Sequence, residues 1–348
     1  MTRSWPEGRS SLRAPLSSLA VALIATVATV AAPAPAAAAG STASPGTVRL
    51  MAVGDVMLAG SIGRRIVRDG PAAPWLDVAA EFAAADLVVA NLECTISMRG
   101  TPWPKRHRFR APLRAADSLA TAGIDIVGLA NNHSLDYGVA AFTDTLQLLD
   151  ERGIGHVGGG RDRARARAPV VVERNGLRVA FLGYILPNSG PQPWYPPQWD
   201  ATQSRPGLAV GTPDAVTSDV ADVRASVDAV VVLFHGGLEH RAGQSDQVRE
   251  FTSAAVRAGA ALVIGTHPYV LQGYQSEGSS LIAYSLGRFV SDRLPGPSRD
   301  SAILDVTLSA AGVQSFSWIP IVIERGFPRP AQGVEIDRIM ARLRPIQP

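Results

Sequence analysis

Short apolar runs alternate along the chain with longer segments in which apolar residues recur at helical spacing. The runs are typical of buried strands, and the spacing between them predicts amphipathic helices. In the first half of the chain we expect strands in residues 47–58, 86–93 and 124–133 and helices in residues 75–85, 111–123 and 140–153. Strands that alternate with helices in this way indicate a layered α/β fold with a partly parallel sheet.

The pattern changes from residue 168 on. Asn175 and Gly176 between two apolar runs predict a β-hairpin. A Pro- and Trp-rich insert follows in residues 187–207, and it is either a loop at the substrate rim or decoration. The α/β pattern then resumes, with helices in 213–226 and 245–259 and strands in 228–237 and 260–268. The last strands look antiparallel and cover residues 281–290, 302–309 and 316–324.

The N-terminal segment differs from this body. Three arginines precede the apolar run 16–32, and an Ala-x-Ala site lies near residues 37–39. This pattern predicts a secretory signal peptide over residues 1–39, with a linker at 40–47. The alternative is an uncleaved membrane anchor, although the apolar run is short for a span. Either interpretation places the body in the extracellular space or the cell envelope.

The body behind this segment has little net charge. The whole chain carries +3, and without residues 1–39 it keeps 30 basic and 29 acidic residues, a net charge of +1. A nucleic-acid partner is therefore not expected. Cys94 is the only cysteine, so no internal disulfide can form. We expect one domain over residues 48–325 and a C-terminal tail over 326–348.

Five predicted strands end in polar or ionisable side chains. These are Asp55, the pair Asn91 and Glu93, the pair Asn132 and His133, His235, and His267. One such residue alone would be a cap, a turn or a packing histidine. The carboxyl ends of parallel strands share one sheet edge, where ligands bind, so five ends predict a shared polar or metal site. Carboxylate, amide and imidazole ligands suit a divalent ion such as Zn, Mn, Mg or Fe.

Several stretches in family order resemble the CapA family of capsule or poly-γ-glutamate synthesis proteins. They are "GDVML", "ADLVVANLE", "RFRAP", "AGIDIVGLANNHSLDYG", "HGGLE", "GTHPYVLQG" and "AYSLGRFV", from about residue 48 to residue 292. The most specific of them is "NNHSLDYG". The resemblance implies a calcineurin-like metallophosphoesterase-type fold with an active site at strand ends, and an anionic cell-surface polymer as the partner.

The resemblance also implies roles for individual residues. One or two divalent ions would be held by Asp55, Glu93, Asn132, His235 and His267. His133 would stabilise developing charge or protonate a leaving group, and Asp136 would orient His133 or cap the following helix. Asn131 would hold the turn.

Four further positions are expected at the substrate-binding part of the cleft: Arg110, Asn91, Glu239 and Tyr269. Arg110 ends the basic stretch 105–110, which is either a rim that holds anions or a solvated loop. Glu239 could equally support a metal ligand from behind.

The chain also departs from the patterns it resembles. Met57 stands where many phosphoesterases carry a histidine, although methionine there fits the CapA pattern. Tyr269 replaces a histidine, Gly236 stands where tryptophan is frequent, and Arg288 where asparagine is frequent. Loss of the second histidine in "HPYV" would weaken one of two metal sites.

Three functions follow from these features. The first is a metal-dependent hydrolase or transferase that acts on an anionic polymer such as poly-γ-glutamate. The second is a non-catalytic accessory that binds the polymer or couples a membrane synthase complex to export. The third, by fold analogy alone, is a metal-dependent phosphoesterase. Bound stoichiometric metal separates the first from the second.

Overall fold

The computed structural model describes residues 46–187, 195–293 and 296–346. The expected signal peptide, residues 1–39, lies outside the described residues. Within the described ranges, each helix is too short or too polar to cross a membrane.

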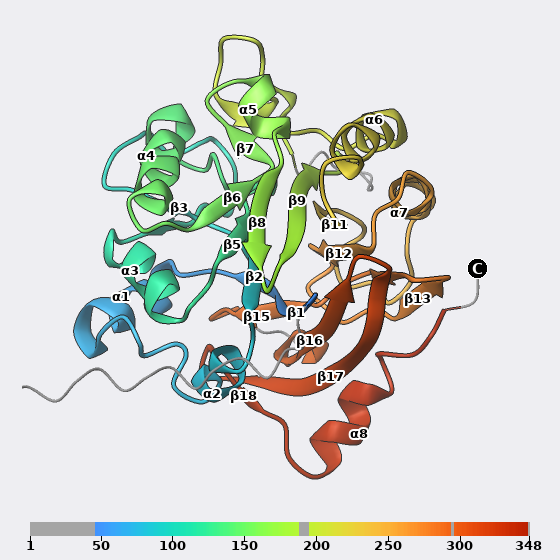
Figure 1. The fold of residues 1–348 in the computed structure, drawn as a ribbon. Coiled ribbons are helices and arrows are strands. Elements are labelled where there is room, and N and C mark those ends of the chain that lie inside the picture. Colours follow the sequence, from blue (N-terminus) through green and yellow to red (C-terminus); the bar gives the residue numbers. More distant parts are fainter. Residues whose placement is uncertain (1–45, 188–194, 294–295, 347–348) are drawn as a thin grey trace, which may run out of the picture. The chain divides into compact units, whose positions relative to one another are not determined.

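Two large sheets form the centre of the described body (Figure 1). The first sheet consists of β1 (Thr47–Val56), β2 (Leu87–Leu92), β5 (Ile126–Gly128), β6 (Gly155–Val157), β15 (Arg288–Val290), β16 (Asp300–Ser309), β17 (Gly312–Glu324) and β18 (Phe327–Pro330). The second consists of β8 (Val170–Arg174), β9 (Leu177–Ile185), β11 (Ala229–His235), β12 (Leu262–Thr266), β13 (Tyr274–Glu277) and β14 (Ser280–Ala283). Two short ladders pair β3 (Thr95–Ile96) with β4 (Arg110–Ala111), and β7 (Gly159–Gly160) with β10 (Gly207–Leu208).

Helices cover the outer face of each sheet, so the body has four layers (Figure 1). On the first sheet lie α1 (Gly60–Asp69), α2 (Ala79–Ala83), α3 (Arg114–Thr121) and α4 (Gly138–Asp150). On the second lie α6 (Pro213–Arg224) and α7 (Asp246–Arg257). The remaining helices are α5 (Arg163–Arg167), α8 (Val334–Met340) and the 3₁₀ turns Pro197–Trp199 and Gly296–Arg299.

Successive side chains of the central strands point to opposite faces of their sheet, and together they contribute to three apolar layers. In β11, Val231 and Leu233 point into the core between the sheets, whereas Val230 and Val232 pack against α6 and α7. Strands buried on both faces are apolar throughout, as is typical of parallel sheets between helices. The predicted layered α/β class is therefore confirmed.

Several segments differ from the prediction. Residues 75–85 were expected to be helical, but only Ala79–Ala83 form a helix. Trp75 is buried instead, and its indole donates to Ser118 Oγ at 2.9 Å. The expectation that the last strands are antiparallel is wrong for β15, which runs parallel to β1, and it holds only in part for β14, which runs parallel to β12. The antiparallel partner of β14 is its neighbour β13.

The segment 326–348, expected as a tail, contributes to the body. Residues Phe327–Pro330 form β18, which pairs with β17. Ile339 and Leu343 are buried in a small apolar cluster with Val322 of β17.

Two glycines bring β1 and β15 together. The amide of Asp55 donates to Gly287 O at 3.0 Å, and a Cβ at Gly54 would lie 1.9 Å from that oxygen. No side chain fits at residue 54, because the obstacle is backbone. This close approach places Asp55 beside Arg288, its partner in the parallel register.

We expect Gly54→Ala to lower the free energy of unfolding by about 3 kcal/mol, because β15 must move away from β1. Gly243→Ala is the matched control, since a Cβ there meets no atom within 4 Å. Urea unfolding of both variants measures the difference. Equal stability of the two variants would show that β1 and β15 do not need their close contact.

Candidate active site

The polar strand ends meet where the carboxyl edges of the two sheets come together. Asp55 and Asn91 lie at the ends of β1 and β2, and Asn132 follows β5, all in the first sheet. His235 ends β11 and His267 follows β12, both in the second sheet. The expectation that one sheet edge carries all of these residues is wrong, because two edges contribute.

His235 joins the two groups of residues. Its Nε2 atom lies 3.1 Å from Asn132 Oδ1 and 3.2 Å from His267 Nδ1. Its Nδ1 atom lies 3.2 Å from Asn91 Nδ2 and 2.9 Å from Thr266 Oγ1. The imidazole therefore contacts polar side chains of both sheets, and it is buried.

Two buried carboxylates lie in this cluster. Asp55 Oδ1 accepts from Asn91 Nδ2 at 2.6 Å, while Asp55 Oδ2 and Glu93 Oε1 find no hydrogen-bond partner among the described residues. Burial raises the pKa of Asp55 to about 7. Burial, together with the charge of Asp55, raises the pKa of Glu93 well above its usual range. Two open carboxylate oxygens in one buried place favour the binding of a cation.

The chemistry of these donors fits a divalent metal ion. Carboxylate oxygen, amide oxygen and neutral imidazole are its common ligands. Burial lowers the pKa of His235 well below its usual range and that of His267 to about 3, so both rings are neutral. As the side chains stand, no three His, Cys, Asp or Glu residues of the described part are arranged around a single point. They form hydrogen bonds with one another instead.

His133 is held by the carboxylate of Asp136. His133 Nδ1 lies 2.7 Å from Asp136 Oδ2, and the His133 ring lies 4.5 Å from the ring of Phe109, measured between centroids. Burial lowers the pKa of His133 to about 4. The N-cap of α4 is Tyr137, without a side-chain cap, so Asp136 contacts His133 and does not cap the helix.

A lysine that the sequence shows only as part of a basic stretch completes this group. Lys105 Nζ lies 2.5 Å from Asp136 Oδ1 and donates to Asn132 O. The ring of Trp199, from the Pro- and Trp-rich insert, lies 4.8 Å from the same Nζ. Lys105, Asp136 and His133 therefore form a chain of contacts that ends at the cleft.

Asn131 lies behind these residues and holds the turn. Its Oδ1 atom accepts from the His133 amide at 3.0 Å and from Ser134 Oγ at 3.1 Å. Its Nδ2 atom donates to Asn91 Oδ1 and Leu92 O, at 3.1 and 2.8 Å. The amide thus fixes the loop after β5 against β2.

A cleft opens beside the cluster, and its empty space of ≈ 750 Å³ includes open solvent. It is lined by Met57, Glu93, His107, Phe109, His133, Glu239, His240, Tyr269, Arg288, Ser291 and Arg293. Of the four residues expected to bind substrate, Glu239 and Tyr269 line it. Asn91 is buried behind it.

Arg110 is not among the residues that line this cleft. Its guanidinium lies 4.4 Å from the ring of Tyr137 and donates to Arg99 O at 3.2 Å. It borders a separate hollow with Arg64. The guanidinium groups of the cleft belong to Arg288 and Arg293, of which the sequence marked only Arg288, as a departure.

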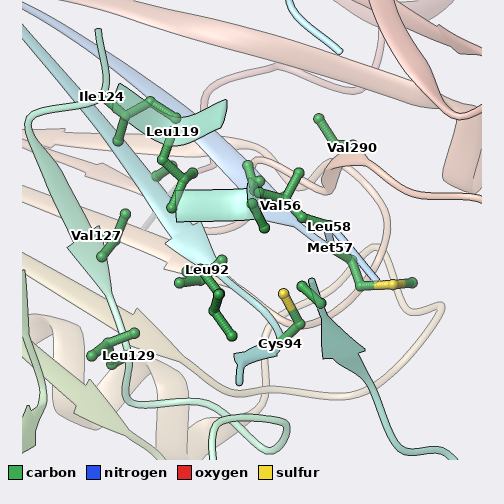
Figure 2. Close-up of a cluster of buried hydrophobic side chains, with 14 of the residues drawn as sticks. Val56, Met57, Leu58, Leu92, Cys94, Leu119, Ile124, Val127, Leu129 and Val290 are labelled. Atoms are coloured by element: carbon green, nitrogen blue, oxygen red, sulfur yellow. The ribbon is translucent and has the colours of Figure 1, made fainter. Parts of the chain in front are cut away.

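The departures from the family pattern have physical reasons. Met57 extends an apolar cluster that includes Leu58 and Cys94 (Figure 2). A Cβ at Gly236 would lie 2.6 Å from Leu186 Cβ, which leaves no room for a tryptophan. Tyr269 lies under Arg288, with 4.0 Å between the guanidinium carbon and the ring centroid.

We expect Lys105→Met to lower the free energy of unfolding by about 2 kcal/mol, because the buried carboxylate of Asp136 loses its cation. Arg99→Met is the matched control, since it removes a cation from the exposed pair with Asp144. Urea unfolding should show no change beyond error in the control. Equal loss in both variants would mean that Asp136 does not depend on Lys105.

Comparisons with known proteins identify the family of the chain. The family model described as "Bacterial capsule synthesis protein PGA_cap" matches residues 49–293. The capsule biosynthesis protein CapA of Bacillus anthracis is 27% identical over 300 residues, which cover 84% of this chain and 71% of that protein. The PGA biosynthesis protein CapA of Bacillus subtilis is 27% identical over 284 residues, with 80% and 73% covered. A probable polyglutamine synthesis accessory protein of Mycobacterium tuberculosis is 30% identical over 233 residues, with 63% and 60% covered.

Solved structures are similar at lower identity. A hypothetical protein from Thermus thermophilus has 15% identity and a TM-score of 0.49, with 81% of this chain and 100% of that chain covered. A putative 5'-nucleotidase from Staphylococcus aureus has 13% identity and a TM-score of 0.47, with 83% and 55% covered.

The family model matches well over half of the chain, including every strand end that contributes to the polar cluster. The predicted layered α/β fold with its polar cluster at strand ends is confirmed in the two-sheet architecture, while its calcineurin-like metallophosphoesterase type remains what the family resemblance implies. The resemblance noted in the sequence is confirmed as well: the chain belongs to the bacterial capsule synthesis protein family PGA_cap.

Proposed function

We propose that this protein acts in the synthesis or processing of a capsule-type anionic polymer, such as poly-γ-glutamate, through a metal-dependent cleft. The family and the names of the Bacillus relatives support the polymer. The observation that carries the metal is the pair of buried carboxylate oxygens, Asp55 Oδ2 and Glu93 Oε1, beside the amide of Asn132 and two neutral imidazoles.

The ion would be held by Asp55, Glu93, Asn132, His235 and His267. When bound, a divalent ion supplies Lewis acidity for the attack of a nucleophile on a γ-glutamyl amide or a phosphoester. A hydrolase also needs a residue that moves protons to and from the reacting groups.

His133 is the proton carrier in this proposal. Since Asp136 accepts the Nδ1 proton, the neutral ring keeps Nε2 as an acceptor. Nε2 can take a proton from the attacking group and return it to the leaving group. Lys105 Nζ, 2.5 Å from Asp136 Oδ1, and Phe109 N, which donates to Asp136 Oδ2 at 2.6 Å, hold that carboxylate in place.

A non-catalytic accessory is the second candidate. Tyr269, which lines the cleft, and Gly236 favour it, because both depart from the family pattern noted in the sequence. The Mycobacterium tuberculosis relative is itself named an accessory protein. A phosphoesterase is the third candidate and rests on fold analogy.

The proposal includes the place of action and the partners. The arginines and the apolar run in residues 1–39 support export to the cell envelope or the extracellular space. There the protein would meet the anionic polymer, alone or with a membrane synthase complex.

Metal analysis tests the proposal. We expect the purified full chain, after incubation with Mn²⁺ or Zn²⁺ and desalting, to retain one or two equivalents, because Asp55 and Glu93 need a cation. Asp55→Asn and His235→Gln should each lose most of the metal at unchanged circular dichroism. His156→Gln is the control, since this histidine lies away from the cluster beside Asp150.

Hydrolysis assays then separate the candidates. A metal-loaded wild type that cleaves γ-linked glutamate oligomers supports the polymer hydrolase, whereas cleavage of phosphate monoesters alone supports the phosphoesterase. Wild-type protein without metal under every loading condition would contradict the metal-dependent cleft and favour the accessory.

A further inference from the structure

Arg288 is a cation buried in the wall of the cleft. Its residue is 9% exposed, and it lies on β15 beside Asp55. Its Nη1 atom donates to Arg293 O, the one acceptor for this guanidinium among the described residues. No Asp or Glu of the described ranges forms an ion pair with it. Most donors of this buried guanidinium are therefore available to a ligand. A buried charge needs such a partner, because burial without one is costly.

The orientation of this guanidinium is fixed. The ring of Tyr269 covers one of its faces at 4.0 Å, a favourable cation–π contact. Tyr269 is buried in turn, and its hydroxyl donates to Glu239 Oε1 at 3.3 Å. With one face stacked and one donor used, the remaining N–H groups point outward in the plane of the guanidinium.

The surrounding charges favour an anion. Asp55 and Glu93 are the acidic groups of the polar cluster whose charges act on Arg288. A divalent cation bound there, as proposed above, would neutralise both carboxylates and leave the charge of Arg288 uncompensated. Arg293, whose Nη1 lies 2.8 Å from His107 Nδ1, adds a second positive group to the same cleft.

We propose that Arg288 binds a carboxylate of the ligand, so that the cleft recognises a glutamyl unit through its free carboxylate next to the reacting bond. This inference rests on the proposed function and names the group that the site recognises. A planar carboxylate matches the in-plane donor fork of a stacked guanidinium. A phosphate with two charges would be repelled more strongly by Glu239, which lines the same cleft.

Titration of a γ-linked glutamate tetramer tests the assignment. The full chain, loaded with Mn²⁺, is titrated by calorimetry as wild type, Arg288→Met, Arg288→Lys and Arg110→Met. We expect about 10- to 100-fold weaker binding in Arg288→Met, because a bidentate charged contact is lost. Arg288→Lys should recover part of the affinity. Arg110→Met, which removes the same charge outside the cleft, should bind within about twofold of wild type.

Metal content, measured on the same samples, separates this inference from the proposed function. Normal metal content with lost tetramer binding in Arg288→Met supports the carboxylate site. Tetramer binding that is equal in wild type and Arg288→Met, or absent in wild type with metal bound, overturns it. Absence of metal in wild type contradicts the proposed function, and the comparison of wild type with Arg288→Met still decides the role of Arg288.

Two controls cover a folding failure of Arg288→Met and binding of phosphate in place of carboxylate. If Arg288→Met does not fold, Arg288→Gln replaces it, because glutamine keeps a donor for Arg293 O. Inorganic phosphate serves as a competitor. Displacement of the tetramer by phosphate at lower concentration than by N-acetylglutamate would overturn the carboxylate assignment in favour of a phosphate site.

Discussion

The burial of two carboxylates between two sheet edges is the constraint on which the site depends. Asp55 and Glu93 are removed from water, and a buried carboxylate is stable only with hydrogen bonds or a cation. Asn91 supplies one hydrogen bond and Arg288 a positive charge. The remaining open oxygens, Asp55 Oδ2 and Glu93 Oε1, support the proposed metal site without reference to any relative.

The sequence predicts the elements and the polar strand ends because both follow from local patterns. Apolar runs on β1, β2, β11 and β12 are hydrophobic on both faces, so they indicate burial but do not say which strands pair. For this reason the second sheet was not predicted, and the parallel pairings of β14 with β12 and of β15 with β1 were missed. Pairing is decided by tertiary packing, which brings His235 to Asn132 across two sheets.

The candidate site was predicted in part for the same reason. Asp55, Glu93, Asn132 and His235 lie at or just after the ends of strands, and strand ends can be predicted from the sequence. Arg110 lies next to a family motif, yet its guanidinium stacks on Tyr137, outside the cleft. Lys105 and Arg288 reach the site through loop packing and through the pairing of β15 with β1, and neither contact leaves a local pattern.

The departures from the family pattern argue for a changed ligand and against a decayed site. Independent losses would leave unrelated gaps, but Tyr269 and Arg288 touch each other, and Tyr269 is held by Glu239. Gly236 likewise agrees with Leu186, which fills the space that a larger side chain would need. Because Arg288 contacts Tyr269 and Tyr269 contacts Glu239, this wall of the cleft is well packed. Since Arg288 is a buried cation with open donors, it is a binding group of the cleft in the proposed carboxylate site.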